Sequence, residues 1–275
     1  MECAWKELLG ILPPGIRGDV DREGKEALQE LRLRINAPPE LVLPGKRKWL
    51  TGKTNQEDLN FVVNGATRYS PWTAASSSQG YLTAPGGHRI GLCGEAVCKD
   101  GIVTGLRTIR SVCIRVARDF PGIGKKAAGL DGSILILGAP GSGKTTLLRD
   151  LIRQRAQTRH VAVVDERCEL FPDGFRQGLY QDTLTGCGKA QGIEMLLRTM
   201  GPEAIAVDEI TAEADTRALL QAACCGVELM ATAHAGSLED FGRRRIYRPL
   251  REANLFQTIL VLGQDQRFTV ERMGL

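Results

Sequence analysis

The C-terminal half of the chain alternates short apolar runs with longer amphipathic stretches. Apolar runs of four or five residues are typical of strands that are buried on both faces of a sheet. These runs lie at residues 134–137, 160–164, 204–207 and 228–232. Apolar residues at helical spacing follow between or after them, at residues 144–151, 193–200 and 212–225. Strands that alternate with helices predict an α/β domain with a mostly parallel, doubly wound sheet.

Further segments complete this predicted domain. A basic segment over 238–253 has helical character with a break near Pro249. Closing strands are expected at 258–262 and 267–272. Residues 173–192 are polar and rich in glycine, so we expect a loop or short elements there.

The N-terminal half has a different pattern. Residues 31–35 and 108–117 alternate between apolar and polar positions, which predicts half-buried strands. Residues 81–94 place two apolar stretches on either side of Gly86-Gly87, and we expect a hairpin there. Residues 69–80 are polar and rich in serine. These features predict a small α+β domain.

Length and composition are those of one large or two modest globular domains. The chain has 275 residues, of which 43% are hydrophobic and 25% are charged. We place a short linker at Pro121-Gly122. The expected division is therefore an α+β domain over residues 1–122 and an α/β domain over residues 123–275.

Net charge and hydropathy limit the expected partners and cellular location of the protein. A net charge of +4 is too small to indicate nucleic-acid binding by itself. No apolar run approaches the ~20 residues of a membrane span. The first twelve residues contain Glu2, Lys6 and Glu7, which are unlike a signal peptide. We expect a cytoplasmic protein without a transmembrane segment.

The chain contains eight cysteines, and none forms a CxxC pair. No histidine lies at ligand spacing from two of them, so a zinc site is not expected. We expect reduced thiols that pack as small buried apolar residues.

A glycine-rich loop joins the first apolar run to a helix. The pattern GxxxxGKT is a Walker A motif, and the strand before it and the helix after it are the context that such a phosphate site requires. Backbone amides and the helix N-terminus would hold the phosphates of ATP, Lys144 would reach the β- and γ-phosphates, and Thr145 would bind Mg²⁺. The residues of the loop are Gly138, Ala139, Pro140, Gly141, Ser142, Gly143, Lys144, Thr145 and Thr146.

Carboxylates follow two of the other predicted strands. Asp208-Glu209 ends the run 204–207, as a Walker B element does, so Asp208 would orient Mg²⁺ and Glu209 would polarise the attacking water. Asp165-Glu166 ends the run 160–164. Either pair could instead cap a helix or lie solvated at a strand end. Glu209, Glu166 and Asp165 all remain candidates for the catalytic base.

Basic residues give two further expectations. His234 follows the run 228–232, where Thr232 and His234 could sense hydrolysis at the γ-phosphate, although a lone histidine is often structural. Arginines are frequent shortly before the linker. They could form a solvated face, or one of Arg107, Arg110 and Arg115 could act as an arginine finger in its own or a neighbouring nucleotide site.

The order of these landmarks resembles a known superfamily. Walker A, a strand ending in VDER at 164–167, Walker B and the segment ATAHA at 231–235 resemble the RecA-like ATPases of type II and type IV secretion systems and pilus motors. Their second and last elements are the Asp box and the His box. Within this superfamily the chain is similar to the stage III sporulation protein AA family. That similarity rests on residues 30–34, 80–83, 86–94 (GGHRIGLCG), 114–118, 182–184, 186–190 and 197–202.

The resemblance implies an ATP-hydrolysing motor that works as an oligomer, a hexameric ring. It further implies a protein at the mother-cell side of the forespore membranes, where it powers or assembles a membrane channel complex during endospore formation. Two other functions stay open: a nucleic-acid-dependent ATPase, although no added nucleic-acid module is visible, and an ATP-dependent assembly scaffold with little turnover.

Overall fold

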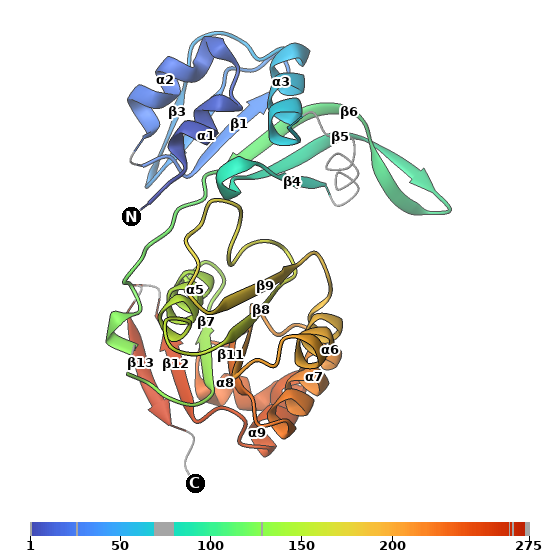
Figure 1. The fold of residues 1–275 in the computed structure, drawn as a ribbon. Helices are drawn as coiled ribbons and strands as arrows, with labels where there is room; N and C mark the ends of the chain where they lie inside the picture. The colour runs from blue at the N-terminus through green and yellow to red at the C-terminus, as the bar shows by residue number, and fades with distance from the viewer. Residues whose placement is uncertain are drawn as a thin grey trace. The chain divides into compact units, whose positions relative to one another are not determined.

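The chain folds as two compact units. The computed structural model describes residues 2–25, 27–68, 80–127, 129–263, 265 and 267–272, so most of the serine-rich segment 69–80 lies outside the described residues. One unit comprises Met1–Asp119 with Pro172–Phe175, and the other comprises Phe120–Phe171 with Arg176–Leu275. Figure 1 shows their elements.

This division differs from the expected boundary after residue 122 in two ways. Residues 120–122 belong to the C-terminal unit because the amides of Gly122 and Gly124 donate hydrogen bonds to the carboxylate of Asp150, at 2.9 and 2.8 Å. Pro172–Phe175 belongs to the N-terminal unit, where Asp173 forms an ion pair with Arg68 at 3.0 Å. Such a return of the chain leaves no mark on hydrophobic periodicity.

The N-terminal unit is built on an antiparallel sheet of order β3-β2-β1-β6-β5-β4 (Figure 1). Its strands are β1 (Glu30–Arg34), β2 (Glu40–Leu43), β3 (Lys46–Trp49), β4 (Tyr81–Thr83), β5 (Arg89–Lys99) and β6 (Ile102–Arg115). Its helices are α1 (Trp5–Gly10), α2 (Pro14–Gly24) and α3 (Gln56–Ala66). Alternate residues of β1, Leu31 and Leu33, are buried in one hydrophobic cluster with Leu8 and Leu59 from the helices.

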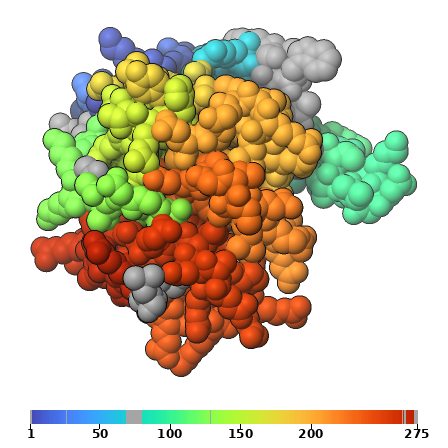
Figure 2. Space-filling model, turned by 60° about the horizontal axis from the view of Figure 1, so that its bottom comes forward, coloured from blue at the N-terminus to red at the C-terminus, as the bar shows by residue number. Residues whose placement is uncertain are grey.

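The hairpin expected over residues 81–94 is the antiparallel pair of β4 and β5. Strands β5 and β6 form a second, longer hairpin, whose outer part the sequence did not indicate. The predicted strands ended at residue 94 and began at residue 108, whereas pairing continues to Lys99 and Ile102. Three register shifts interrupt this pairing. Bulges of this kind break the two-residue alternation, which explains why the outer part of the hairpin was missed. Its end projects beyond the rest of its sheet (Figures 1 and 2).

The C-terminal unit contains the predicted α/β sheet, with the order β13-β12-β7-β11-β10-β8-β9. Every pair is parallel except β12 with β13. The strands are β7 (Ile134–Gly138), β8 (Val161–Asp165), β9 (Gln181–Thr185), β10 (Ala204–Val207), β11 (Glu228–His234), β12 (Thr258–Leu262) and β13 (Phe268–Arg272). The helices are α5 (Lys144–Arg155), α6 (Lys189–Thr199), α7 (Glu213–Cys224), α8 (Leu238–Arg243) and α9 (Arg248–Glu252). The mostly parallel sheet is confirmed.

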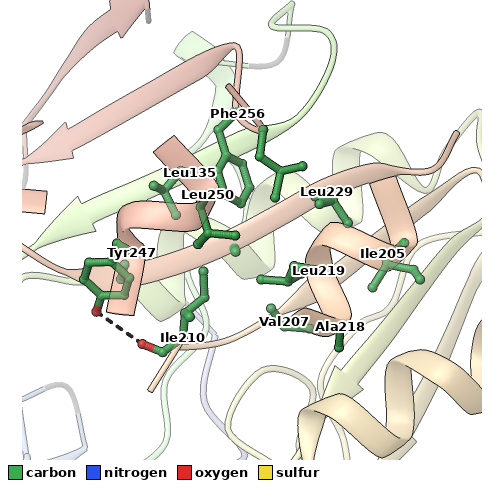
Figure 3. Close-up of a cluster of buried hydrophobic side chains, with 14 of the residues drawn as sticks. Leu135, Ile205, Val207, Ile210, Ala218, Leu219, Leu229, Tyr247, Leu250 and Phe256 are labelled. Atoms are coloured by element: carbon green, nitrogen blue, oxygen red, sulfur yellow. Dashed lines mark hydrogen bonds between the residues drawn. The ribbon is translucent and has the colours of Figure 1, made fainter. Parts of the chain in front are cut away.

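Hydrophobic clusters line both faces of this sheet, so its central strands are buried throughout. One cluster holds Leu135 of β7, Val207 of β10 and Leu219 of α7, and Figure 3 shows its packing. Tyr247 closes the cluster: its ring stacks on Phe241 with 4.8 Å between centroids, and its hydroxyl donates to the Ile210 carbonyl at 3.2 Å. The second cluster contains the alternate strand residues, which point to the opposite face of the sheet and pack against α5.

The segment 173–192, where a loop or short elements were expected, contains the short strand β9 and the start of α6. Two other local expectations need correction. The helical break lies at Arg244, whose backbone is extended, whereas Pro249 is in the first turn of α9, where no amide hydrogen is needed. The cysteines are all free, but none is fully buried. Four of them lie exposed on β5 or at the end of α7, where no second layer covers them: Cys93, Cys98, Cys224 and Cys225.

Candidate nucleotide-binding site

The Walker A loop connects β7 to α5, as the sequence predicted. Gly141 and Gly143 have φ angles of 75° and 100°, which only glycine adopts without strain. Gly138 has no room for a side chain, because a Cβ there would lie 2.6 Å from the Ser142 Oγ and 3.0 Å from the Leu262 carbonyl. Glycine at these positions therefore permits the tight turn in which backbone amides can converge on a phosphate.

Lys144 lies buried at the start of α5. Its Nζ donates to the carbonyls of Gly138 and Ala139 at 3.0 and 2.9 Å, and lies 3.1 Å from Nδ1 of His234. Burial lowers the pKa of Lys144 from its usual 10.5, while the charges of Glu209 and Asp208 oppose this shift. The ammonium is thus placed over the loop and beside the ends of two other strands.

Asp208 joins three elements at the carboxyl edge of the sheet. Its Oδ2 accepts a hydrogen bond from the Thr145 hydroxyl at 2.8 Å. Its Oδ1 accepts one from the Thr232 hydroxyl at 2.8 Å. The parallel pairing of β7, β11 and β10 produces this meeting, since it aligns their ends. The structure therefore brings together the two residues predicted to hold Mg²⁺, and Thr232, a candidate sensor of hydrolysis, hydrogen-bonds to one of them.

Glu209 and His234 form a pair, with 2.8 Å between Oε1 and Nε2. The Glu209 amide donates to the Thr232 hydroxyl at 2.9 Å. The backbone of Glu209 has a φ of 37°, a conformation that non-glycine residues adopt at a cost. Together with Lys144, these side chains make a continuous polar contact from the P-loop lysine through His234 to Glu209.

Asp165 has a different position from the one expected of a base. Its side chain is buried, and its carboxylate accepts the backbone amides of Glu169, Leu170 and Phe171 at 2.8, 3.0 and 2.9 Å. Both oxygens are therefore used to hold the loop after β8. The expectation that Asp165 could act as the base does not fit this arrangement.

Glu166 forms an ion pair with Lys189, a buried residue at the start of α6. Lys189 also lies 4.0 Å from Asp215, which caps α7. A small pocket brings Glu166 and Lys189 together with Asp208 and Glu209. Lys189 was not predicted as a site residue, because it belongs to no nucleotide-binding motif. The available signal was its place in the segment 186–190, one of those that carry the family resemblance.

The three arginine candidates all lie on β6 of the N-terminal unit. Their side chains are exposed. Arg107 lies 3.4 Å from Glu95, and Arg115 lies 3.4 Å from Glu30. Neither unit by itself brings these arginines together with the Walker residues, and their role as fingers stays a prediction.

An apolar pocket adjoins the P-loop within the C-terminal unit. Its P-loop and α5 side is formed by Ser142, Gly143, Thr146 and Leu147. Its apolar walls are Phe120, Ile123, Leu262 and Phe268. These residues were not predicted from the sequence, where the available signal was a pair of large apolar side chains, Phe120 and Ile123, on either side of Pro121-Gly122. The pocket offers a flat ligand apolar contact directly beside the phosphate loop.

The sequence profile of one family matches nearly the whole chain. This family is described as sporulation stage III, protein AA, and the match covers residues 5–271. The chain belongs to this family. Stage III sporulation protein AA of Bacillus subtilis strain 168 is 34% identical over 282 residues, which cover 94% of this chain and 91% of the relative.

Solved structures identify the fold of this family member. The pilus retraction motor PilT with bound ADP has a TM-score of 0.62 at 15% identity, covering 88% of this chain and 76% of that chain. The ATPase DotB of Legionella pneumophila has a TM-score of 0.57 at 17% identity, covering 92% and 78%. The fold is that of the RecA-like secretion ATPases. Among the described residues, no helix is long and apolar enough to cross a membrane.

Proposed function

We propose that this chain binds and hydrolyses ATP with the help of Mg²⁺. The observation that carries the proposal is the meeting of Thr145, Asp208 and the Glu209–His234 pair at the carboxyl ends of three adjacent strands. Ligands of open α/β sheets bind at this edge. The fold of secretion ATPases supports the same conclusion.

The residues present fit a nucleotide. Ser142 has a buried hydroxyl without a hydrogen-bond partner among the described residues, and Gly138 leaves no space for a side chain under the loop. The loop amides and Lys144 would hold the phosphates, and Thr145 with Asp208 would hold Mg²⁺. One or two protein ligands suffice for this ion, which keeps water and phosphate oxygens as its other ligands. Mg²⁺ would supply neutralising charge on the phosphates.

Glu209 is the favoured base. Its carboxylate lies at the strand end next to Asp208, and it can accept a proton from water that attacks the γ-phosphate. His234 contacts both Glu209 and Lys144, so it can transmit a change at the phosphates to the base. Glu166 is the alternative catalytic base, but its carboxylate already forms an ion pair with Lys189.

The apolar pocket beside Ser142 and Gly143 would bind the nucleobase of ATP.

Membership of the sporulation stage III, protein AA family points to the cellular task. We propose a motor that powers or assembles a membrane channel complex during endospore formation, working as a hexameric ring at the cytoplasmic, mother-cell face of the membrane. This proposal for the cellular task rests on the family and on the fold of the motor ATPases, and not on the residues of the site.

Lys144→Ala provides the decisive test. The variant should lose ATP binding or turnover, since the phosphates lose a cation, while its circular dichroism and melting temperature stay close to those of the wild type. Steady-state phosphate release by the purified full chain measures turnover, with and without Mg²⁺. Activity of the variant within twofold of the wild type would contradict the assignment.

A further inference from the structure

The residues that follow the N-terminal unit form one wall of the apolar pocket. We call residues 120–127 the linker segment; it ends in a short 3₁₀ turn at Lys125–Ala127, where Ala127 is buried. Phe120 and Ile123 face the pocket and are 37% and 39% exposed, so apolar surface is left open beside the P-loop. In Figure 2 the light-green residues of this region lie against the red C-terminal strands.

A single buried carboxylate holds this segment in place. Asp150 lies on α5 and is 2% exposed. Its Oδ1 accepts the Gly122 amide at 2.9 Å, and its Oδ2 accepts the Gly124 amide at 2.8 Å. Arg153 neutralises the carboxylate at 3.0 Å, and Gln154 donates a further hydrogen bond at 2.6 Å. Charge-assisted hydrogen bonds of this kind are stronger than neutral ones.

The two glycines are fitted to this attachment. Gly122 has a φ of 88°, and a Cβ on Gly124 would lie 3.0 Å from Leu151 and 3.2 Å from the Asp150 carboxylate. Phe120 and Ile123 flank Gly122 in the chain, so the position of both side chains depends on where Asp150 holds the backbone between them. Asp150 itself lines neither the apolar pocket nor the pocket that contains Glu166.

We infer that Asp150 is a positioning residue for the nucleotide base: it fixes the linker segment so that Phe120 and Ile123 form the wall against which the base packs. This inference rests on the proposed function. Two parts of the site then bind two parts of the nucleotide. The P-loop holds the phosphates, and the wall of Phe120 and Ile123, which Asp150 keeps in position, contacts the nucleobase.

The test compares two ligands that differ only in whether they carry a nucleoside. The affinities of ATP and of inorganic tripolyphosphate, each with Mg²⁺, are measured by calorimetry for the wild type and for Asp150→Asn in the full chain. Asn keeps the size of the side chain but loses one acceptor and the charge. We expect ATP affinity to fall about tenfold, or about 1.4 kcal/mol. Tripolyphosphate affinity should stay within twofold of the wild type.

Gly122→Ala gives a second route that leaves the buried Asp150–Arg153 pair intact. The added Cβ is strained at the φ of 88° and should shift the linker segment from Asp150. Gly226→Ala is the matched control: it has a φ of 78° with no neighbour within 4 Å of the new Cβ, in the same unit but at the end of α7. Gly122→Ala should reproduce the selective loss of ATP affinity, and Gly226→Ala should not.

The possible results separate this inference from the function on which it rests. Equal losses for ATP and tripolyphosphate in Asp150→Asn, or unchanged ATP affinity in both Asp150→Asn and Gly122→Ala, would overturn the role of Asp150. If Asp150→Asn fails to fold, Gly122→Ala decides by the same criterion. If the wild type binds neither ligand, the proposed function itself fails.

Discussion

Glu209 is held from both its backbone and its side chain, since its amide donates to Thr232 and its carboxylate contacts His234. A base that is fixed in this way needs no reorganisation before it acts. Glu166 lies in the same pocket but is engaged by Lys189. The two carboxylates can therefore be distinguished by substitution.

Glu209→Gln should bind ATP with nearly wild-type affinity and turn it over at least tenfold more slowly, a barrier change of about 1.4 kcal/mol, because the amide cannot accept a proton. Single-turnover hydrolysis and nucleotide titration measure the two effects. Glu166→Gln is the matched control, and a larger loss of turnover in that variant would place the base in the Asp box.

His88 is the buried histidine of the sequence GGHRIG. Its Nε2 lies 2.9 Å from the Ala4 carbonyl, and its Nδ1 accepts the Ala117 amide at 3.1 Å, so the ring is neutral and links both ends of the N-terminal unit. Burial lowers the pKa of His88 below its usual 6.5. Below pH 6.5 the unfolded state therefore binds a proton more readily than the folded state does, and stability falls as the pH falls.

The melting temperature of the N-terminal unit should accordingly drop as the pH is lowered from 6.5, and this drop should be smaller in His88→Gln. The three tryptophans of the chain lie at positions 5, 49 and 72, so tryptophan fluorescence reports on this unit. Wild type and variant with the same pH dependence would show that His88 does not contribute to it.

At the scale of the elements, prediction succeeded for the strands of the C-terminal sheet that are buried on both faces. The run 204–207 matches β10 residue for residue, since a strand covered on both faces has no polar position to blur its limits. Strand β3 was missed because all four of its residues are exposed. The helices α1 and α2 were missed because α1 has only six residues and α2 buries only Val20 and Gly24, so neither carries a clear apolar stripe.

Those residues of the candidate site that belong to sequence motifs could be predicted, and the others could not. The P-loop, Asp208 and His234 could be named as candidates because each lies at the end of a recognisable strand. Lys189 and Asp150 were not predicted, because their contacts are with residues distant in the sequence. Lys189 pairs with Glu166, and Asp150 accepts the amides of Gly122 and Gly124. Their partners can be identified only when the fold is known.

The loop after β8 gives a prediction about stability. Asp165→Ala would leave three amides without an acceptor, two of them buried and that of Glu169 partly buried. We expect a loss of roughly 2–4 kcal/mol in the free energy of unfolding, because each buried amide without a partner costs about 1–3 kcal/mol and water can reach the third. Urea denaturation measures this loss. Reduced turnover with unchanged stability would instead return Asp165 to the list of candidate bases.

At the scale of the whole molecule, the arginines of β6 link the two units only by hypothesis. If one of them completes a nucleotide site, the single variants Arg107→Ala, Arg110→Ala and Arg115→Ala should include one that lowers turnover much more than ATP affinity, because an arginine finger acts mainly in the transition state. A finger that acts across subunits would also make turnover depend on protein concentration.

Enzyme titration over a wide concentration range measures this dependence. Arg47, which lies on β3 and pairs with Glu40 at 3.4 Å, provides a control substitution in the same unit. Normal hydrolysis by all three variants would show that these residues form a solvated face or stabilise the hairpin.

The return of Pro172–Phe175 to the N-terminal unit determines where the chain can be divided into fragments. The chain passes between the units three times, after Asp119, after Phe171 and after Phe175. A Cβ on Gly87 would lie 2.5 Å from Pro172, so the returning segment is closely fitted to its unit. A fragment that stops at residue 119 lacks a piece of its own surface, and one that starts at residue 120 carries four residues whose packing partners have been removed. Neither half is an independent excisable module, and domain exchange between relatives must carry both segments together.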